Sequence, residues 1–369
     1  MRSTVRTPKL REACFSDHEQ IARLESRFGL APKSYEERTH LWLGNPLYKD
    51  LQGEWTIGWV LEDENRRIVA TMANIPLLYE FEGKTLIVAS GSNWVAEPSC
   101  RSASLLLLDH VINQSDVDLY LNNTVSAASA AAVTALGCSR VPVGQWDKSA
   151  IWTTDYQSVF ERRLARRKIV FAKPLSRAIA AGIRLKDRLV TKALRKGDVE
   201  VSHCTRFDDR FDDFWETLRQ RHPHLLLAVR TRDVLEWHYK YALLNDKLWI
   251  AIVVDGPRLA AYATFQRMDR PVWGKRVRLV DYQSLDGSTA LLTPLLSWAL
   301  AKCRDERIHT LEIVGRWLEN GELGEPVTPS VRELPTWKFV YRATTAALAA
   351  SLRNPRAWAP SLFDGDASL

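Results

Sequence analysis

The sequence lacks most features that mark secreted, metal-binding and membrane-spanning proteins. Its five cysteines are scattered, odd in number and without a C-x-x-C pair, which argues against a disulfide framework and against a zinc site. No segment reaches the roughly 18 consecutive apolar residues of a membrane-spanning helix. Residues 1–12 are charged and lack the apolar run of a signal peptide. We therefore expect a cytoplasmic protein in a reducing compartment.

Patterns for metal and nucleic-acid binding are also missing. His222, His224 and His238 have no partners at a ligand spacing. Asp364 and Asp366 flank a glycine as in a turn, but no Glu or His follows at the spacing that a calcium or magnesium site needs. No nucleic-acid motif appears. We predict neither a bound metal ion nor a nucleic-acid partner.

What the chain does contain is typical of a globular protein. Hydrophobic residues make up 46% and charged residues 26% of its 369 residues, a length that suits two domains. The 14 tryptophans fit a large core or aromatic-lined clefts.

Charge is distributed unevenly along the chain. Residues 162–196 hold 13 Lys and Arg against one acid, Asp187, so this segment has a net charge of +12. The whole chain has a net charge of +7, so the remaining residues together carry −5. Such a helical segment is either a solvated basic face or a surface that meets anionic lipid or an acidic polymer. The second interpretation predicts a peripheral contact with the inner face of the membrane.

The order of predicted elements repeats. In the first half, a helical region is predicted at residues 12–45. Strands are predicted at 55–61, 68–81, 86–95 and 116–121, helices at 105–112 and 127–136, and closing strands at 140–143 and 149–153. In the second half, strands, one helix and a last strand follow at 248–254, 259–267, 276–284, 289–303 and 308–314. Equivalent points lie at a near-constant offset of roughly 190 residues, which favours two copies of one fold.

We expect an α/β (α+β) protein of two tandem domains, each with a mixed central sheet flanked by helices. The predicted units are a first domain at residues 1–155, a basic helical linker at 156–198, a second domain at 199–345 and a tail at 346–369.

The segment Val95-Ala-Glu-Pro98-Ser-Cys-Arg101-Ser-Ala-Ser-Leu-Leu106 links a predicted strand to a helix. With the later Leu136-Gly137-Cys138, it resembles the core of GNAT (GCN5-related) N-acyltransferases, and the whole chain resembles tandem-GNAT and FemAB-type bacterial transferases. In that family this turn reads Arg/Gln-x-x-Gly-x-Gly/Ala. Arg101 matches the first position, whereas Ser104 and Leu106 replace the two glycines, so the motif is degenerate.

The resemblance implies that this turn holds the pyrophosphate of acetyl-CoA or a longer acyl-CoA at a helix N-terminus. The cofactor-binding residues would be Arg101, Ser102, Ala103, Ser104 and Leu105. Backbone N–H groups around Asn93, Trp94 and Val95 would bind the thioester carbonyl.

No general acid follows from the resemblance, because Ser126 and Val133 stand where the family places an Asn and a Tyr. Glu97 ends the third strand, where a base could deprotonate the acceptor, and Asn122 and Asn123 end the next strand facing the same cleft. Asp281 is flanked by apolar residues in the second copy, which could raise its pKa. Glu97, Asn123 and Asp281 are the predicted catalytic residues, and each also fits a capping, turn or ion-pair role.

These patterns together predict an acyl-CoA-dependent N- or O-acyltransferase. Its acceptor would be a small molecule or a glycan, such as an envelope glycan or its precursor. Two alternatives stay open. One is a degenerate module that binds an acidic glycan or a lipid head group, and the other is a membrane scaffold anchored through residues 162–196.

Overall fold

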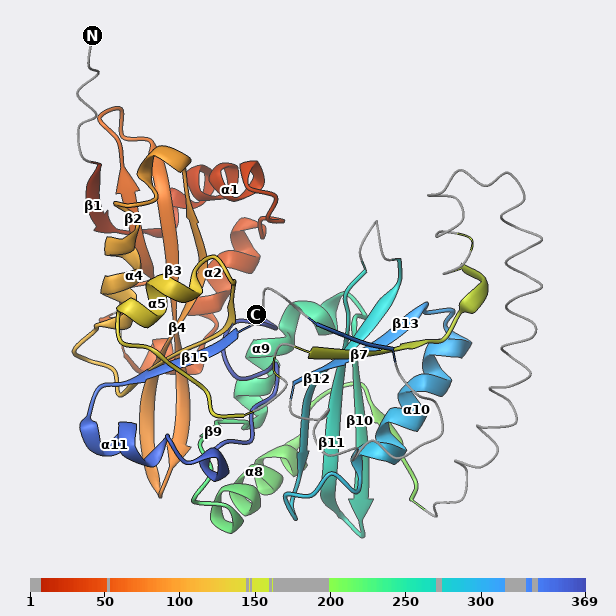
Figure 1. The fold of residues 1–369 in the computed structure, drawn as a ribbon. Coiled ribbons are helices and arrows are strands. Elements are labelled where there is room, and N and C mark those ends of the chain that lie inside the picture. Colours follow the sequence, from red (N-terminus) through yellow and green to blue (C-terminus); the bar gives the residue numbers. More distant parts are fainter. Residues whose placement is uncertain are drawn as a thin grey trace.

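The computed structural model describes residues 8–51, 54–143, 146, 148–158, 161, 199–269, 274–315, 330–333 and 338–369. Two mixed β-sheets lie side by side, and helices flank each of them (Figure 1). The basic segment 162–196, and with it most of the predicted helical linker 156–198, lies outside the described residues.

The first sheet is built around a long hairpin. Strands β3 (Ile68–Phe81) and β4 (Lys84–Ala96) pair along almost their whole length. Its strand order is β1 (Lys9–Glu12), β2 (Gly58–Glu62), β3, β4, β5 (Leu119–Val125), β15 (Lys338–Ala343) and β6 (Ser139–Arg140), and β9 (Leu227–Ala228) pairs with β3. All pairs are antiparallel except β4 with β5.

The second sheet repeats this plan. Its strand order is β14 (Ser330–Glu333), β7 (Lys148–Thr153), β13 (Thr310–Val314), β12 (Arg276–Ser284), β11 (Arg258–Arg267), β10 (Leu248–Asp255) and β8 (Ser202–Cys204). Again a single pair, β12 with β13, is parallel. The predicted fold class, two mixed sheets flanked by helices, is confirmed.

The two sheets exchange their closing strands. The sequence places residues 149–153 at the end of the first copy, but the corresponding strand β7 pairs with β13 in the second sheet. Strand β15, from the second half of the chain, pairs with β5 at the place where residues 149–153 were expected. The assignment of 149–153 to the first sheet is therefore wrong. Side-chain alternation identifies a strand but carries little information about which edge it joins.

Helices cover both faces of the first sheet. Helix α1 (His18–Arg27) buries Ile21 and Leu24 in one cluster with Val60 of β2. The next residue, Leu61, belongs to another cluster, which contains Leu107 of α4 (Leu105–Ile112). Because successive side chains of a strand point to opposite faces, α1 and α4 lie on opposite sides of the sheet, as Figure 1 shows.

Local signals explain where the other helices begin. Helix α2 (Tyr35–Leu43) follows a capping box of Ser34 and Glu37, and α3 (Pro46–Asp50) has proline in its first turn. The first sheet also carries α5 (Ala130–Ala135), whereas α8 (Asp209–Arg221), α9 (Arg232–Leu244) and α10 (Leu292–Asp305) accompany the second.

The end of the chain returns to the first sheet. After α11 (Ala346–Ser351), residues 358–369, which we call the C-terminal segment, run between the two sheets and are largely buried. The Leu362 N–H donates to the Val280 carbonyl of β12 at 3.0 Å. The sequence indicated only a tail here, whereas the segment packs as part of the core.

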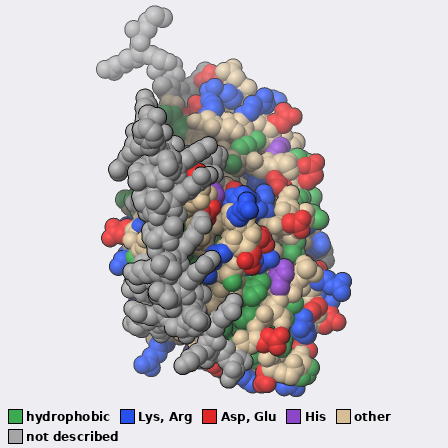
Figure 2. Space-filling model, turned by 90° about the vertical axis from the view of Figure 1, so that its right-hand side faces the viewer, with side chains coloured by type: hydrophobic (Ala, Val, Ile, Leu, Met, Phe, Trp, Pro, Cys, Tyr) green, Lys and Arg blue, Asp and Glu red, His purple; other side chains and the backbone are tan. Residues whose placement is uncertain are grey.

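The described surface carries charges of both signs. Figure 2 shows Lys and Arg interspersed with Asp and Glu on the described part of one face. Among the described residues, no helix has the length and apolar character needed to cross a membrane. The same residues contain no group of three or more His, Cys, Asp and Glu placed to hold a metal ion.

Candidate functional site

The candidate site is the fork where parallel strands β4 and β5 separate. They pair only from Val88 to Ser90 and from Leu119 to Leu121. Beyond that point β4 continues with β3 to Ala96, and β5 continues with β15 towards Val125. A cavity of about 440 Å³ occupies the fork.

A β-bulge distorts β4 beside this cavity. Thr71 of β3 faces Val95 and Ala73 faces Ser92, so Asn93 and Trp94 together oppose the single residue Met72. Asn93 has a φ of +50°, in the left-handed region that non-glycine residues rarely adopt. A bulge leaves a backbone group out of the ladder and points it elsewhere. The predicted thioester-binding residues Asn93 and Trp94 therefore lie at a local irregularity on the cavity wall.

Buried polar atoms without a hydrogen bond gather in this cavity. In the described part of the chain, four of ten such side-chain atoms belong to residues that line it: Arg38 Nε, Trp94 Nε1, the Tyr120 hydroxyl and Asp366 Oδ1. An unsatisfied buried polar group costs about 1–3 kcal/mol. Such groups are few in folded proteins and call for a functional explanation.

Residues from both faces of the sheet line the cavity. Lys33, Arg38 and Trp42 reach it from the side of α1 and α2, and Leu108 of α4 and Val133 of α5 reach it from the opposite side. Lys33 makes no hydrogen bond or ion pair with any other described residue, and burial lowers its pKa. Arg38 is paired with the buried Glu25. Two separate molecules could thus approach one point from opposite faces.

Asp366 of the C-terminal segment supplies the cavity's unpaired carboxylate. The Thr124 hydroxyl of β5 donates to its Oδ2 at 2.7 Å, and its Oδ1 has no hydrogen-bond partner. Burial raises the pKa of Asp366 to about 6, although the Thr124 hydrogen bond opposes this shift. Sequence patterns gave no reason to select this residue, since it stands in an acidic turn far from the β4–β5 motif.

Asn123, a predicted catalytic residue, binds the C-terminal segment. Its side-chain amide donates to the Asp364 carbonyl, and its Oδ1 accepts from the Ala367 N–H at 2.9 Å. Gly365 lies between these contacts with a φ of +106°, and an added Cβ there would stand 3.0 Å from the Asn123 side chain. Asn123 is fully buried and fixes the backbone on both sides of Asp366. Its neighbour Asn122 lines the cavity and donates to the Gly91 carbonyl at 2.6 Å.

Asp281, a second predicted catalytic residue, lies in a buried ion-pair cluster. Arg230 binds Asp281 at 2.8 Å and Asp364 at 3.2 Å, and Tyr262 donates to Asp281 at 2.9 Å. Burial opposes ionisation of Asp281, yet the Arg230 guanidinium holds its pKa below the ordinary value. Burial raises the pKa of Asp364, the other acid that Arg230 binds. The cluster ties β12 to the C-terminal segment.

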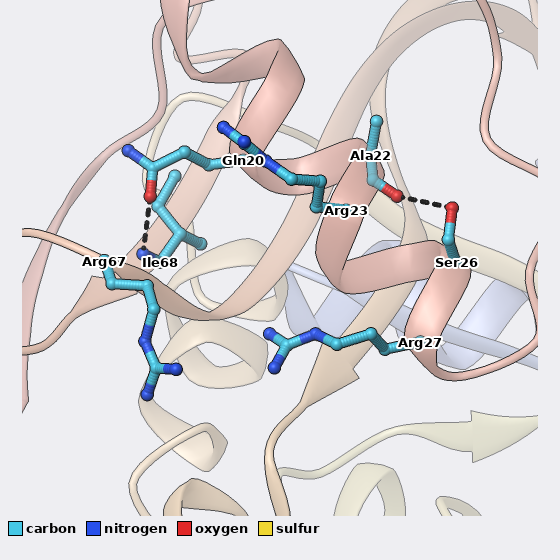
Figure 3. Close-up of a pocket in the computed structure, with 7 residues that line it drawn as sticks. All are labelled: Gln20, Ala22, Arg23, Ser26, Arg27, Arg67 and Ile68. Atoms are coloured by element: carbon cyan, nitrogen blue, oxygen red, sulfur yellow. Dashed lines mark hydrogen bonds between the residues drawn. The ribbon is translucent and has the colours of Figure 1, made fainter.

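Glu97, the third predicted catalytic residue, is paired with arginines that line another pocket. Its carboxylate lies 2.8 Å from Arg27 and 3.5 Å from Arg67. Both arginines line a pocket of about 680 Å³ beside α1, together with Arg23 (Figure 3). Arg23 is paired with Glu19 at 3.5 Å, so acids offset the arginines of this pocket. The structure thus places Glu97 in surface ion pairs and does not include it among the residues that line the cavity.

The predicted pyrophosphate turn lies between β4 and α4, with a short 3-10 helix at Pro98–Cys100. In this described turn, the N–H groups of Arg101, Ser102 and Ala103 donate no backbone hydrogen bond, whereas that of Ser104 donates to the Cys100 carbonyl. Arg101 and Ser102 are exposed. Three available N–H groups before a helix fit an anion such as a phosphate.

The residues that replace the family glycines have clear positions. The Ser104 hydroxyl donates to the Arg101 carbonyl at 2.8 Å, so it braces the turn. Leu105 and Leu106 are 42% and 46% exposed, and their side chains project away from the core at the start of α4. Leu106 therefore does not fill the helix entrance. Val95 is buried beneath α1.

The equivalent fork in the second sheet is filled by charges. Strands β12 and β13 pair from Arg276 to Arg278 and then separate. Glu312 of β13 binds Arg278 at 2.8 Å, Arg276 at 2.9 Å and Arg332 at 2.8 Å. Burial opposes ionisation of Glu312, but Arg278 and Arg276 hold its pKa below the ordinary value.

Comparison with known proteins shows the fold. No protein-family model matches the chain, and no curated protein resembles it significantly in sequence. A GCN5-related N-acetyltransferase from Anabaena variabilis matches 91% of this chain and 73% of its own, at 14% identity and a TM-score of 0.54. A GCN5-related N-acetyltransferase from Kribbella flavida matches 92% of this chain and 72% of its own, at 13% identity and a TM-score of 0.53. Saccharomyces cerevisiae N-myristoyltransferase with bound myristoyl-CoA matches 92% of this chain and 80% of its own, at 10% identity and a TM-score of 0.52.

The chain therefore has the tandem GNAT fold that these enzymes share. The expected likeness to this fold is confirmed over nearly the whole chain, and the likeness to FemAB-type transferases stays a prediction. Identities of 10–14% carry no information about acceptor or acyl chain.

Proposed function

We propose that this protein transfers an acyl group from acyl-CoA to an amine or hydroxyl group of an acceptor. The observation that carries the proposal is the cavity at the β4–β5 fork, whose lining includes four residues that each have one buried side-chain atom without a hydrogen-bond partner among the described residues. The GNAT fold supports it, because the proteins that share it include acetyltransferases and an enzyme solved with myristoyl-CoA.

The donor would lie on the α4 and α5 side of the fork. Its phosphates would meet the N–H groups of Arg101, Ser102 and Ala103, and the Arg101 guanidinium would add a charge-assisted contact. Ser104 and Leu105 would shape the start of α4. The residues present fit an anionic co-substrate, since this turn offers a cation and three N–H groups, those of Arg101, Ser102 and Ala103, that donate to no backbone carbonyl of the described residues.

The reacting carbonyl would lie at the β4 bulge. The backbone at Asn93 and the unpartnered Trp94 Nε1 are the donors available to a developing oxyanion. Donors fixed in advance stabilise such a charge without reorganising during the reaction. Acceptor and thioester would meet by entering from opposite faces, so positioning would supply much of the rate enhancement.

The acceptor would enter from the side of α1 and α2. We propose a small molecule or a glycan, as the sequence suggested. Lys33, the unpaired cation on this side of the cavity, supports an acceptor that carries a negative group near its nucleophile. Contact of residues 162–196 with an anionic membrane, which would bring the protein to such a glycan, stays part of this proposal.

Acetyl-CoA binding tests the proposal. Calorimetry should show binding to the wild type and a weaker affinity for Arg101→Ala, which removes one phosphate contact. Arg258→Ala, at an exposed arginine in the β10–β11 turn, is the matched control and should bind as the wild type does. A series from acetyl-CoA to myristoyl-CoA would define the acyl length.

A folded wild type that binds no acyl-CoA would refute the enzymatic proposal. The degenerate module that binds an acidic glycan or a lipid head group would then be the better account. Sedimentation with vesicles containing phosphatidylserine, at low and high salt, would test that account.

A further inference from the structure

Asp366 occupies a position from which it can take part in the reaction itself. We infer that Asp366 is the general base that removes a proton from the acceptor's nucleophile, an inference that rests on the proposed acyl transfer. The residue lines the cavity at the β4–β5 fork, although it lies 242 positions along the chain from Thr124, its hydrogen-bond partner on β5.

The two carboxylate oxygens of Asp366 have different environments. Oδ2 is held by the Thr124 hydroxyl at 2.7 Å, which fixes the orientation of the group. Oδ1 has no hydrogen-bond partner and is closed off from solvent. A base needs one oxygen that is positioned and one that can accept a proton. The arrangement supplies both.

The C-terminal segment around Asp366 is fixed at several points. Asn123 bonds the backbone at Asp364 and at Ala367, on both sides of Asp366. Gly365 permits this approach through its positive φ. A base on a segment fixed in this way keeps its position relative to β5, which a base on a loose tail would not.

The charges near Asp366 are already compensated or lie elsewhere. Arg230 binds Asp364, the other acid of the same turn, and no cation of the described residues forms an ion pair with the Asp366 carboxylate. On β5, Tyr120 stays protonated because burial holds its pKa well above the ordinary value. On β4, the side chain of Ser92 interacts with the carboxylate and lowers its pKa, which opposes the effect of burial. Lys33 and Arg38 also line the cavity, and His238 of α9 is bonded to Ser368 at 2.8 Å.

Burial is the main influence on the carboxyl group and raises its pKa to about 6. At neutral pH most of the group is then ionised, and it is a stronger base than an exposed aspartate. Both conditions favour proton removal near physiological pH.

The reaction is balanced with this one residue. Asp366 takes a proton from the acceptor nitrogen or oxygen as the lone pair of that atom bonds to the thioester carbonyl carbon. The C=O electrons move to oxygen, where donors at the β4 bulge can stabilise them. They then return to form the amide or ester as the C–S bond breaks. The departing thiolate takes back the proton that Asp366 holds, which leaves free CoA and the ionised carboxylate.

The test compares Asp366→Asn with the wild type. Asparagine keeps the shape of the side chain and can still accept from Thr124, but it cannot take the proton. Release of CoA from acetyl-CoA is followed from pH 5 to 9 with glycinamide, glucosamine and water as acceptors. Asp255→Asn, at an exposed position on β10, is the matched control.

We expect Asp366→Asn to bind acetyl-CoA as the wild type does and to lose 10²–10⁴-fold in rate, the range typical of a general base. The rise in wild-type rate with an apparent pKa of about 6 should also disappear. Circular dichroism and the retained binding would show that the variant is folded.

Two results would overturn the inference and differ in what else they affect. If Asp366→Asn releases CoA at the wild-type rate with the same pH profile, Asp366 is not the base, although the acyltransferase proposal survives. If the wild type binds no acetyl-CoA, both proposals fail together.

Discussion

The forks of the two sheets have the same topology and opposite contents. At the β4–β5 fork, four residues around a cavity each have one buried side-chain atom without a hydrogen-bond partner in the described part of the chain. At the β12–β13 fork, Glu312 is bound by three arginines. At the first fork, polar atoms lie around a cavity where a ligand could bind them, whereas at the second fork the buried carboxylate of Glu312 is bound by arginines of the same chain.

Under the function proposed above, this difference separates a site for chemistry from a site for stability. Buried charges that are paired and hydrogen-bonded fix a structure, whereas unpaired ones cost free energy and persist where function requires them. The second half also contributes to the first fork, because it supplies β15 and the C-terminal segment that carries Asp366. Neither fork is complete without the other half of the chain.

Removing the cation of the buried cluster should have the largest effect. Arg230→Met leaves Asp281 and Asp364 buried without a cationic partner, which typically costs 3–5 kcal/mol. Urea unfolding should show this loss, and adding Asp281→Asn should restore part of it by removing one charge. A single variant as stable as the wild type would contradict the view that this cluster stabilises the structure.

A substitution at the β4–β5 fork should raise the free energy of unfolding rather than lower it. The pKa of Asp366 is raised in the folded state, so its contribution to stability is present below its unfolded pKa of about 4 and is lost as pH rises through about 6. Asp366→Asn should therefore be about 2–3 kcal/mol more stable than the wild type at pH 8 and nearly equal at pH 4. Urea unfolding at both values measures this, and equal differences at the two pH values would contradict it.

The approach of the C-terminal segment to β5 can be tested at Gly365. Alanine there would place a Cβ 3.0 Å from the Asn123 side chain at a φ of +106°. We expect a loss of about 2–3 kcal/mol, made up of backbone strain and this close contact. Gly83→Ala is the matched control, because Gly83 has a φ of +74° but no atom within 4 Å of the added Cβ. A loss no larger than in the control would show that the contact is unimportant.

Neutralising Glu97 should have the smallest effect. Its carboxylate is paired with Arg27, whose side chain is 49% exposed, and such surface pairs contribute about 0–1 kcal/mol. Glu97→Gln should therefore unfold within 1 kcal/mol of the wild type and release CoA at a similar rate. A 100-fold drop in rate with folding intact would restore Glu97 as the base and displace Asp366.

The sequence allowed the order of elements and the tandem fold to be predicted, because strands, turns and helices are encoded locally. The β4 turn and helix α4 lie where the pattern 95–106 placed them. The exchange of β7 and β15 could not be predicted, since strand partners are chosen by long-range packing.

The candidate site was predictable only in part for the same reason. Asn93, Trp94 and Asn122 line the cavity, as their places at the ends of β4 and β5 suggested. Asp366 is brought there by contacts of very long sequence separation, and its acidic turn gave no local signal of a cleft. Asp281 was selected for its apolar neighbours, but burial of that kind does not tell a base from an ion pair. Only the position of Arg230 does.

A crystal structure with acetyl-CoA bound would test the central claim most directly. The account predicts that the phosphates lie at Arg101–Ala103 and that the thioester lies in the β4–β5 cavity, between the Asn93 bulge and Asp366. Binding at the β12–β13 fork, or a thioester placed away from this cavity, would contradict it.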